Sequence, residues 1–443
     1  AAHHYTEAGL NNEAIDYWQR AGQQALQRSA YAEAMSHLTI ALDLLTTLPE
    51  SRARSQQELV VQMTLGIALR ATKGQAAPEV ERLYIRAHEL CERVGEPLQR
   101  FRVLWGLWMV YSNRGEYHPM LQVGEQLLRL AQHLQDPDLR LEAHHALWAS
   151  YFLGGELTAA RPHFEQGLRL YEPQRHRTHA ALYSGHDPGV CCHQLAAPSL
   201  WLLGYPDQAV ANSQAALTLA QQLAHPYTLT LALYFAAMVH HLCRDVPLTQ
   251  ARAEALMTVA TEQEFPLHLA QAMPLRGWTL SESGQAEAGI VQIHQGLAAY
   301  QATGATRDRP YYLALLAEAS ARVGQTTAGL EALAEALATL AKSGVPWWEA
   351  ELYRLRGELL LLAANNEAAA EACFHQALDI APRRQARSLE LRAAMSLARL
   401  WQRQDKRVEA HQLLAPIYGW FTEGFDTADL QEARVLLDQL AES

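Results

Sequence analysis

The chain has 443 residues, of which 49% are hydrophobic and 19% are charged, as is ordinary for a folded soluble protein. Its formal net charge of -11 at pH 7 argues against a general binder of nucleic acid, because such proteins neutralise phosphates with clustered lysine and arginine. The five scattered cysteines do not suggest a secreted disulfide framework, and neither a membrane span nor a signal peptide is visible, so we expect a cytoplasmic protein.

Residues 18–42 carry the first copy of an internal repeat. A large residue and small residues share one face of a first helical segment, and small and apolar residues share one face of the next. Small residues let two antiparallel helices approach closely, while bulky residues fill the space beside the crossing. The pattern resembles the tetratricopeptide (TPR) repeat. Its residues are Trp18, Ala21, Gly22, Ala25, Ala34, Leu38 and Ala41.

Turns followed by this pattern recur with a period mostly of about 40 residues. HEAT-type repeats share that period, but pairs of small residues on the return segments, such as Ala209 and Ala216, favour the TPR-like alternative. We predict an all-α, TPR-like α-solenoid, a right-handed superhelix of about ten antiparallel hairpins in one array over 1–443, with a C-terminal capping helix at 426–441. The turns are expected near residues 29, 75, 115, 155, 204, 244, 284, 324, 365 and 405.

Two steps of the repeat are longer than the others. The first contains a charged, proline-bearing stretch between Leu45 and Gln57, which is typical of a solvated loop. The second lies between Gly155 and Gly204, and we place an inserted loop there at 173–187.

Several segments resemble the TPR regions at the C-terminal end of large bacterial signalling ATPases, which are often fused to a class III adenylate or guanylate cyclase domain. The resemblance covers nearly the whole chain and includes HHYTEAGLNNEAIDYWQRAG, HDPGVCC and PWWEAELYRLRGELLL. It implies that this chain, which lacks an initiator Met, is part of a longer parent whose nucleotide-binding domain precedes it. No G-x-x-x-x-G-K-[ST] motif occurs here, so we predict no catalytic activity and no cofactor for the chain itself.

The stretch HRTHAALYSGHDPGVCCH within the inserted region is rich in metal-ligand residue types. Asp187 followed by Pro188 indicates a helix start, because the aspartate caps free N–H groups and proline is tolerated in the first turn. Cys191 and Cys192 are adjacent on that helix and point about 100° apart, and no zinc-ligand spacing occurs, so we predict no metal site and disfavour a metal-dependent enzyme. The loop residues that we expect to brace or line the groove are His176, His179, His186 and Asp187.

The stronger candidate site is the concave face, lined by the first helix of each hairpin. Aromatic, methionine and histidine side chains there suit a mixed or apolar ligand, or an amphipathic partner helix. Aromatic residues at helical spacing also pack in cores, so we expect about half of them to be buried. The residues placed on or near this face are Trp105, Met109, His145, Trp201, Tyr234, Met238, His241, Trp278, Tyr311 and Glu318.

Two further features each have two possible interpretations. Arg392, Arg399 and Arg403 share one helix face and form a basic patch that could dock an acidic peptide or a phosphate group, or could pair with neighbouring hairpins. Trp347 and Trp348 either join consecutive hairpins or serve as exposed binding anchors.

Together these features predict a non-catalytic protein-interaction or sensor module. It would be the regulatory repeat region of a larger signalling ATPase or nucleotide cyclase, and its groove would bind a partner segment or another domain of the same parent chain. The alternative is a small-molecule receptor domain, whose groove pocket is closed by the loop at 173–187. Neither nucleic acid nor a membrane is an expected partner.

Overall fold

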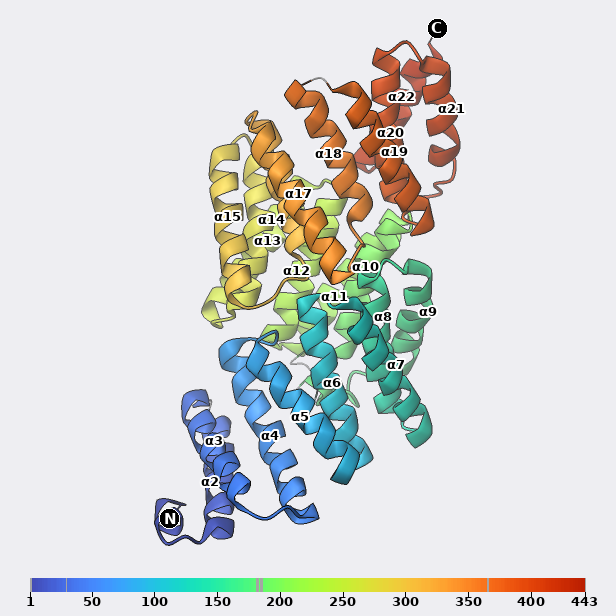
Figure 1. Ribbon diagram of the computed structural model, residues 1–443. Helices are drawn as coiled ribbons and strands as arrows, with labels where there is room; N and C mark the ends of the chain where they lie inside the picture. Colours follow the sequence, from blue (N-terminus) through green and yellow to red (C-terminus); the bar gives the residue numbers. More distant parts are fainter. Residues whose placement is uncertain (1, 29, 181–182, 184–185, 365, 443) are drawn as a thin grey trace. The chain divides into compact units, whose positions relative to one another are not determined.

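The computed structural model describes the chain except residues 1, 29, 181–182, 184–185, 365 and 443 (Figure 1). Over the described residues the chain forms twenty-two α-helices and no β-strand, which confirms the all-α prediction. None of the described helices combines the length and the apolarity that a membrane span requires. The chain divides into two compact units where we expected one array, so a single array over 1–443 stays a prediction.

Unit 1 comprises Ala1–Ala146 and Thr303–Ala305. Its helices pack as sequential pairs, and apolar side chains from α2 to α6 form its main core, with Trp18, Leu38 and Tyr84 among the buried residues. The helices of this unit are α1 (Ala2–Glu7), α2 (Asn11–Gln27), α3 (Tyr31–Thr47), α4 (Arg52–Lys73), α5 (Pro78–Val94), α6 (Pro97–Arg114), α7 (Tyr117–Leu134) and the first part of α8 (Pro137–Leu153).

Unit 2 comprises Leu147–Ala302 and Thr306–Ser443. It contains the end of α8 and the remaining helices. These are α9 (Leu157–Leu170), α10 (Pro188–Leu202), α11 (Pro206–Leu223), α12 (Pro226–Leu242), α13 (Val246–Glu262), α14 (Pro266–Glu282), α15 (Ala286–Ala302), α16 (Arg309–Arg322), α17 (Thr326–Ser343), α18 (Glu349–Ala364), α19 (Glu367–Arg383), α20 (Arg387–Arg403), α21 (Arg407–Tyr418) and α22 (Ala428–Ala441).

Local sequence explains where many of these helices begin and turn. Proline occupies the first turn of α5, α6, α10, α11 and α12, where a missing backbone N–H costs nothing. Several hairpin turns contain a residue with a left-handed backbone, most often glycine, as at Gly284 (φ 85°) and Gly324 (φ 72°). Arg244 (φ 61°) and Asp405 (φ 59°) take the same conformation without being glycine.

The helices of unit 2 form two layers. Each helix packs on its neighbours in sequence, and the even-numbered helices from α10 to α22 also pack on one another in order, so they form the inner layer. The inner layer returns to its start, because α20 also contacts α10. The repeat in this unit therefore curves until its last hairpin meets its first.

Small residues allow the closest helix crossings in unit 2. A Cβ atom added to Gly289 of α15 would lie 2.4 Å from the carbonyl oxygen of Gly277 in α14, and one added to Gly296 would lie 2.6 Å from Pro274. Real side chains do not approach so closely, so glycine sets the separation of these two helices.

Candidate functional site

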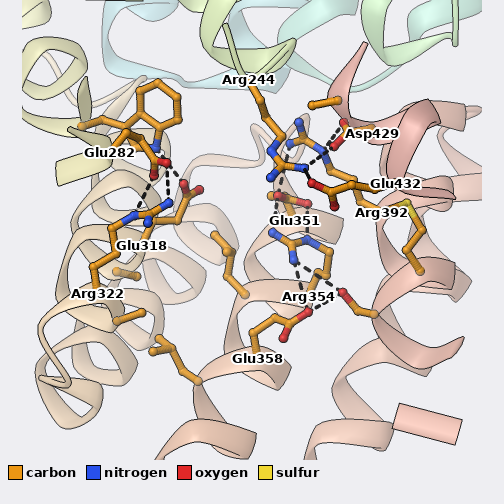
Figure 2. Close-up of a pocket in the computed structure, with 18 of the residues that line it drawn as sticks. Arg244, Glu282, Glu318, Arg322, Glu351, Arg354, Glu358, Arg392, Asp429 and Glu432 are labelled. Carbon is orange, nitrogen blue, oxygen red and sulfur yellow. Dashed lines mark hydrogen bonds and ion pairs between the residues drawn. The ribbon is translucent and has the colours of Figure 1, made fainter. Parts of the chain in front are cut away.

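A cavity of about 370 Å³ opens among the inner helices of unit 2 (Figure 2). Side chains from α12, α14, α16, α18, α20 and α22 line it, together with Arg244 of the turn after α12 and Val246 at the start of α13. Because these helices are consecutive members of the inner layer, the curvature of the unit brings residues as far apart in sequence as His241 and Glu432 into one wall.

The wall carries both charge signs. Five arginines line the cavity beside six carboxylates. Figure 2 shows two groups of them, with Glu282, Glu318 and Arg322 on one side and the other labelled residues on the other side. An apolar part of the wall includes Ala317, Ala321, Leu355, Leu359 and Leu362. The charged residues are Arg244, Arg322, Arg354, Arg392 and Arg399, with Glu282, Glu318, Glu351, Glu358, Asp429 and Glu432.

A buried ion pair stands at the centre of this wall. Arg354 donates from Nε and Nη2 to the two carboxylate oxygens of Glu351, at 2.9 and 2.8 Å. Arg392 donates from Nη1 to Glu351 Oε1 at 3.3 Å. Burial alone would raise the pKa of Glu351, but the two guanidinium groups lower it to about 2. Glu351 therefore stays ionised at neutral pH.

Arg392 also joins the two ends of the unit. Its Nη2 donates to the carbonyl oxygen of Leu242 at 2.6 Å, and its Nε donates to Asp429 Oδ2 at 2.8 Å. The guanidinium lies 4.8 Å from the centre of the Trp201 ring. A single buried side chain of α20 thus contacts α10, the end of α12, and α22.

The more exposed arginines of the wall are also paired with carboxylates. Arg244 and Arg399 each donate to Glu432, at 2.7 and 2.8 Å. On the other side of the cavity, Arg322 Nε donates to Glu282 Oε1 at 2.8 Å. A further carboxylate, Glu358, lies 3.5 Å from Arg354 and accepts from the Ser396 hydroxyl at 2.6 Å.

Glu318 is the exception among the lining carboxylates. The indole Nε1 of Trp278 donates to its Oε2 at 2.9 Å, but within the described part of the chain no lysine or arginine nitrogen lies within 4.0 Å of it. Burial, with a smaller contribution from the negative charge of Glu351, raises the pKa of Glu318 to about 7. The Glu318 carboxyl is therefore a mixture of protonated and ionised forms at neutral pH.

His241 forms the base of the cavity next to Trp278. Its ring contacts Trp278 edge to face with centroids 4.5 Å apart, and its Nδ1 shares a 2.8 Å hydrogen bond with the Tyr311 hydroxyl. Burial lowers the pKa of His241 to about 3, so the ring is neutral at physiological pH.

Of the predicted groove residues, His241, Trp278 and Glu318 lie together in this wall. The Trp201 ring contacts the Arg392 guanidinium, and the Tyr311 hydroxyl is hydrogen-bonded to His241. Tyr234 and Met238 are buried in the core of unit 2. In unit 1, Trp105, Met109 and His145 are also buried. The expectation that about half of the set would be exposed is wrong, because the aromatic rings fill the spaces between successive inner helices.

The three arginines of the predicted basic patch lie in different environments. Arg392 and Arg399 line the cavity, and both are paired with carboxylates, as in the alternative of ion pairs to neighbouring hairpins. Arg403 is exposed and is not among the lining residues. Trp347 and Trp348 are buried and contact each other and Tyr311, so they join hairpins.

The loop at 173–187 leads into the start of α10. Asp187 caps α10 by accepting from the backbone N–H of Val190 at 3.0 Å, and Pro188 is the first helical residue, as predicted. Tyr171 donates to Asp187 at 3.0 Å, and Glu172 N donates to His176 Nδ1 at 2.9 Å. The loop residues His176, His179, His186 and Asp187 are buried and are not among those that line the cavity, while 181–182 and 184–185 lie outside the described residues.

Most residues of the charged wall were not among those predicted from the sequence. Glu351, Arg354 and Glu358 recur at helical spacing with Leu355 and Leu359, so one face of α18 is both charged and partly buried. That mixed face was the available signal. Its partners on α20 and α22 lie far away in sequence, and nothing local indicates them.

The comparisons with known proteins agree with the fold. No family model matches the chain. An uncharacterized protein of Rhizobium meliloti (strain 1021) is 27% identical over 401 residues, which are 90% of this chain, and the chain spans 39% of that relative's length.

Two solved structures have a fold similar to that of this chain. A Rap protein complexed with Competence and Sporulation Factor has a TM-score of 0.61 at 12% identity, over 85% of this chain and 99% of that one. The apo form of RapI has a TM-score of 0.52 at 11% identity, over 65% of this chain and 98% of that one. The chain is a TPR-like helical-repeat protein, as its sequence predicted.

Proposed function

We propose that this chain is a non-catalytic protein-interaction or sensor module, and that its unit 2 cavity receives a segment of a partner polypeptide or of another domain of its parent chain. The observation that carries the proposal is the cavity wall, which combines polar groups at fixed positions with an apolar strip. The Rap protein of similar fold is itself complexed with Competence and Sporulation Factor, which supports a binding role for such a repeat.

The position of the cavity supports a sensory role. Its wall includes α12 and also α20 and α22, the elements that Arg392 joins. A ligand that contacts both ends favours the arrangement in which they meet, and a ligand shifts an equilibrium by its difference in affinity for the two states. Binding in the cavity would therefore be coupled to closure of unit 2.

We place the chain in the regulatory repeat region of a larger signalling ATPase or nucleotide cyclase. Its segments resemble the TPR regions of such proteins, and the Rhizobium meliloti relative extends far beyond the matched region. In that setting, closure of unit 2 would be the signal passed to the catalytic domain.

Selection from a random linear peptide library tests the binding role. After selection on the whole chain, the affinity of recovered peptides is measured for Ala321→Trp, which fills the apolar wall, and for Val291→Trp, a matched control on the exposed face of α15. We expect the cavity variant to weaken binding about tenfold or more, roughly 1.4 kcal/mol, and the control to have no effect. Equal effects of the two variants would place the binding surface elsewhere.

A small-molecule receptor is the second candidate, because a cavity of about 370 Å³ is within the range of small-ligand sites. The described residues of the loop at 173–187 do not contribute to the wall, so this candidate would work without the loop as a lid. A thermal-shift screen against metabolites tests it, since a ligand that binds only the folded state raises the apparent melting temperature.

A further inference from the structure

In the part of the chain that the structure describes, the pairing of charges leaves one carboxylate of the cavity without an arginine partner. Within the described residues, each of the five lining arginines lies within 4.0 Å of at least one carboxylate of the wall, and five of the six carboxylates have such a partner. Glu318 is the remaining one, and the Trp278 indole donates to it at 2.9 Å. An entering anion would meet arginines that are already paired, whereas an entering cation would meet a carboxylate that has no arginine or lysine nitrogen within 4.0 Å among the described residues.

An apolar strip lies directly beside this carboxylate. Ala317 and Ala321 flank Glu318 on α16, and Leu355 and Leu359 approach from α18. Small alanine side chains leave space along α16 for an aliphatic chain, and methylene groups gain by leaving water. Toward solvent the strip ends at Leu362, whose surface is 63% exposed.

On the basis of the proposed function, we propose that Glu318 recognises a basic side chain, lysine or arginine, of the bound polypeptide. The ammonium or guanidinium group pairs with the Glu318 carboxylate beside Trp278. Its methylene stem lies along Ala321 and Leu359, and apolar neighbours in the polypeptide meet Leu362. The recognised chemistry is thus a cation on an aliphatic stem within a peptide.

The test uses the same random peptide library on the whole chain, with Glu318→Gln as the variant and Glu331→Gln as the matched control. Glu331 is an exposed residue of α17 outside the cavity, so the control removes an equal charge without touching the wall. Peptides selected on the unmodified chain are expected to share a lysine or arginine at one position. A peptide in which norleucine or citrulline replaces that residue is then synthesised as a neutral partner.

Binding affinities from fluorescence anisotropy complete a double-mutant cycle. Glu318→Gln and the neutral peptide are each expected to weaken binding about 10- to 100-fold, while their combination is no weaker than either alone. Glu331→Gln should leave the affinity unchanged. Selected peptides without a common basic residue, or losses that multiply in the combination, would overturn the proposal while leaving the peptide-binding function standing.

The experiment is also informative if the library yields no peptide. If no peptide is recovered but n-pentylguanidinium raises the melting temperature of the unmodified chain and not that of Glu318→Gln, the cavity takes a free organic cation. The peptide-binding function then falls, and with it the assignment to a polypeptide side chain. If neither occurs, both proposals are wrong.

Discussion

Glu318 and Glu351 are neighbouring carboxylates of one cavity with opposite behaviour. Arg354 and Arg392 lower the pKa of Glu351 to about 2, whereas burial beside that same negative charge raises the pKa of Glu318 to about 7. The difference comes from the arginines, which contact Glu351 and not Glu318. A cationic ligand beside Glu318 would lower the pKa of its carboxyl group, because a nearby opposite charge favours the ionised form.

The raised pKa of Glu318 predicts a pH-dependent stability. The folded chain holds a proton on Glu318 that the unfolded chain releases above its ordinary pKa of 4.5, so stability is lost as pH rises from there through about 7. Glu318→Gln removes this loss because glutamine cannot ionise. We expect the variant to be more stable than the unmodified chain by about 1 to 2 kcal/mol at pH 8, allowing for partial solvent screening, and unchanged near pH 4.5.

Urea unfolding at the two pH values measures this difference, with Glu331→Gln as the control for loss of a surface charge. An equal gain for Glu318→Gln at both pH values would show that its effect does not come from ionisation. A stabilising change in a cavity residue is the usual sign that the native residue serves binding at the expense of stability.

At the scale of helices, the crossing of α14 and α15 depends on glycine. A Cβ atom at position 289 would lie 2.3 Å from Ser281 Oγ and 2.4 Å from the Gly277 carbonyl oxygen, so Gly289→Ala must push the two helices apart. We expect a loss of about 1 to 3 kcal/mol in the free energy of unfolding. Val291→Ala, on the exposed face of the same helix, should change it by less than about 0.5 kcal/mol. Chemical denaturation of both variants checks this, and comparable values would contradict it.

The sequence predicted this level of structure because its signals are local. Small residues such as Gly289 and Gly296 recur on the return helix of a hairpin, and Asp187 with Pro188 defines a helix start without reference to distant residues. Side-chain exposure was harder to predict. Tyr234 has the helical spacing of a groove residue, yet its hydroxyl meets that of Tyr312 at 3.0 Å in the core, because helices distant in sequence cover it.

The long-range contacts of unit 2 could not be predicted from the repeat pattern. Gln208 donates to Glu423 at 2.8 Å, and Arg384 donates to the carbonyl oxygen of Gly154 at 3.2 Å, across most of the unit. A repeat pattern specifies contacts between neighbouring hairpins, whereas the return of α20 to α10 depends on curvature accumulated over several hairpins. The contacts that depend on this return, from Arg244 to Asp429 and Glu432 and from Arg392 to the Leu242 carbonyl, could therefore not be predicted from sequence patterns.

Arg392 offers a direct test of how unit 2 closes. Arg392→Met keeps an apolar stem but leaves Asp429 and the Leu242 carbonyl without this donor and removes one of the two cations beside Glu351. Removing one partner of a buried ion pair costs about 3 to 5 kcal/mol, and we expect that loss in urea unfolding.

The same change should also have a local signature, because Arg392 joins α20 to α12 and α22. Hydrogen exchange is expected to accelerate in α20, α22 and the end of α12, while α2 to α5 of unit 1 keep their protection, since local opening follows the contacts that are lost. Arg403→Met is the matched control: it removes an exposed arginine from the same helix and should change stability by less than about 0.5 kcal/mol. Equal effects of the two substitutions, or a uniform acceleration of exchange, would show that closure of unit 2 does not depend on the Arg392 contacts. The proposed coupling between ligand binding in the cavity and closure of unit 2 would then be unsupported.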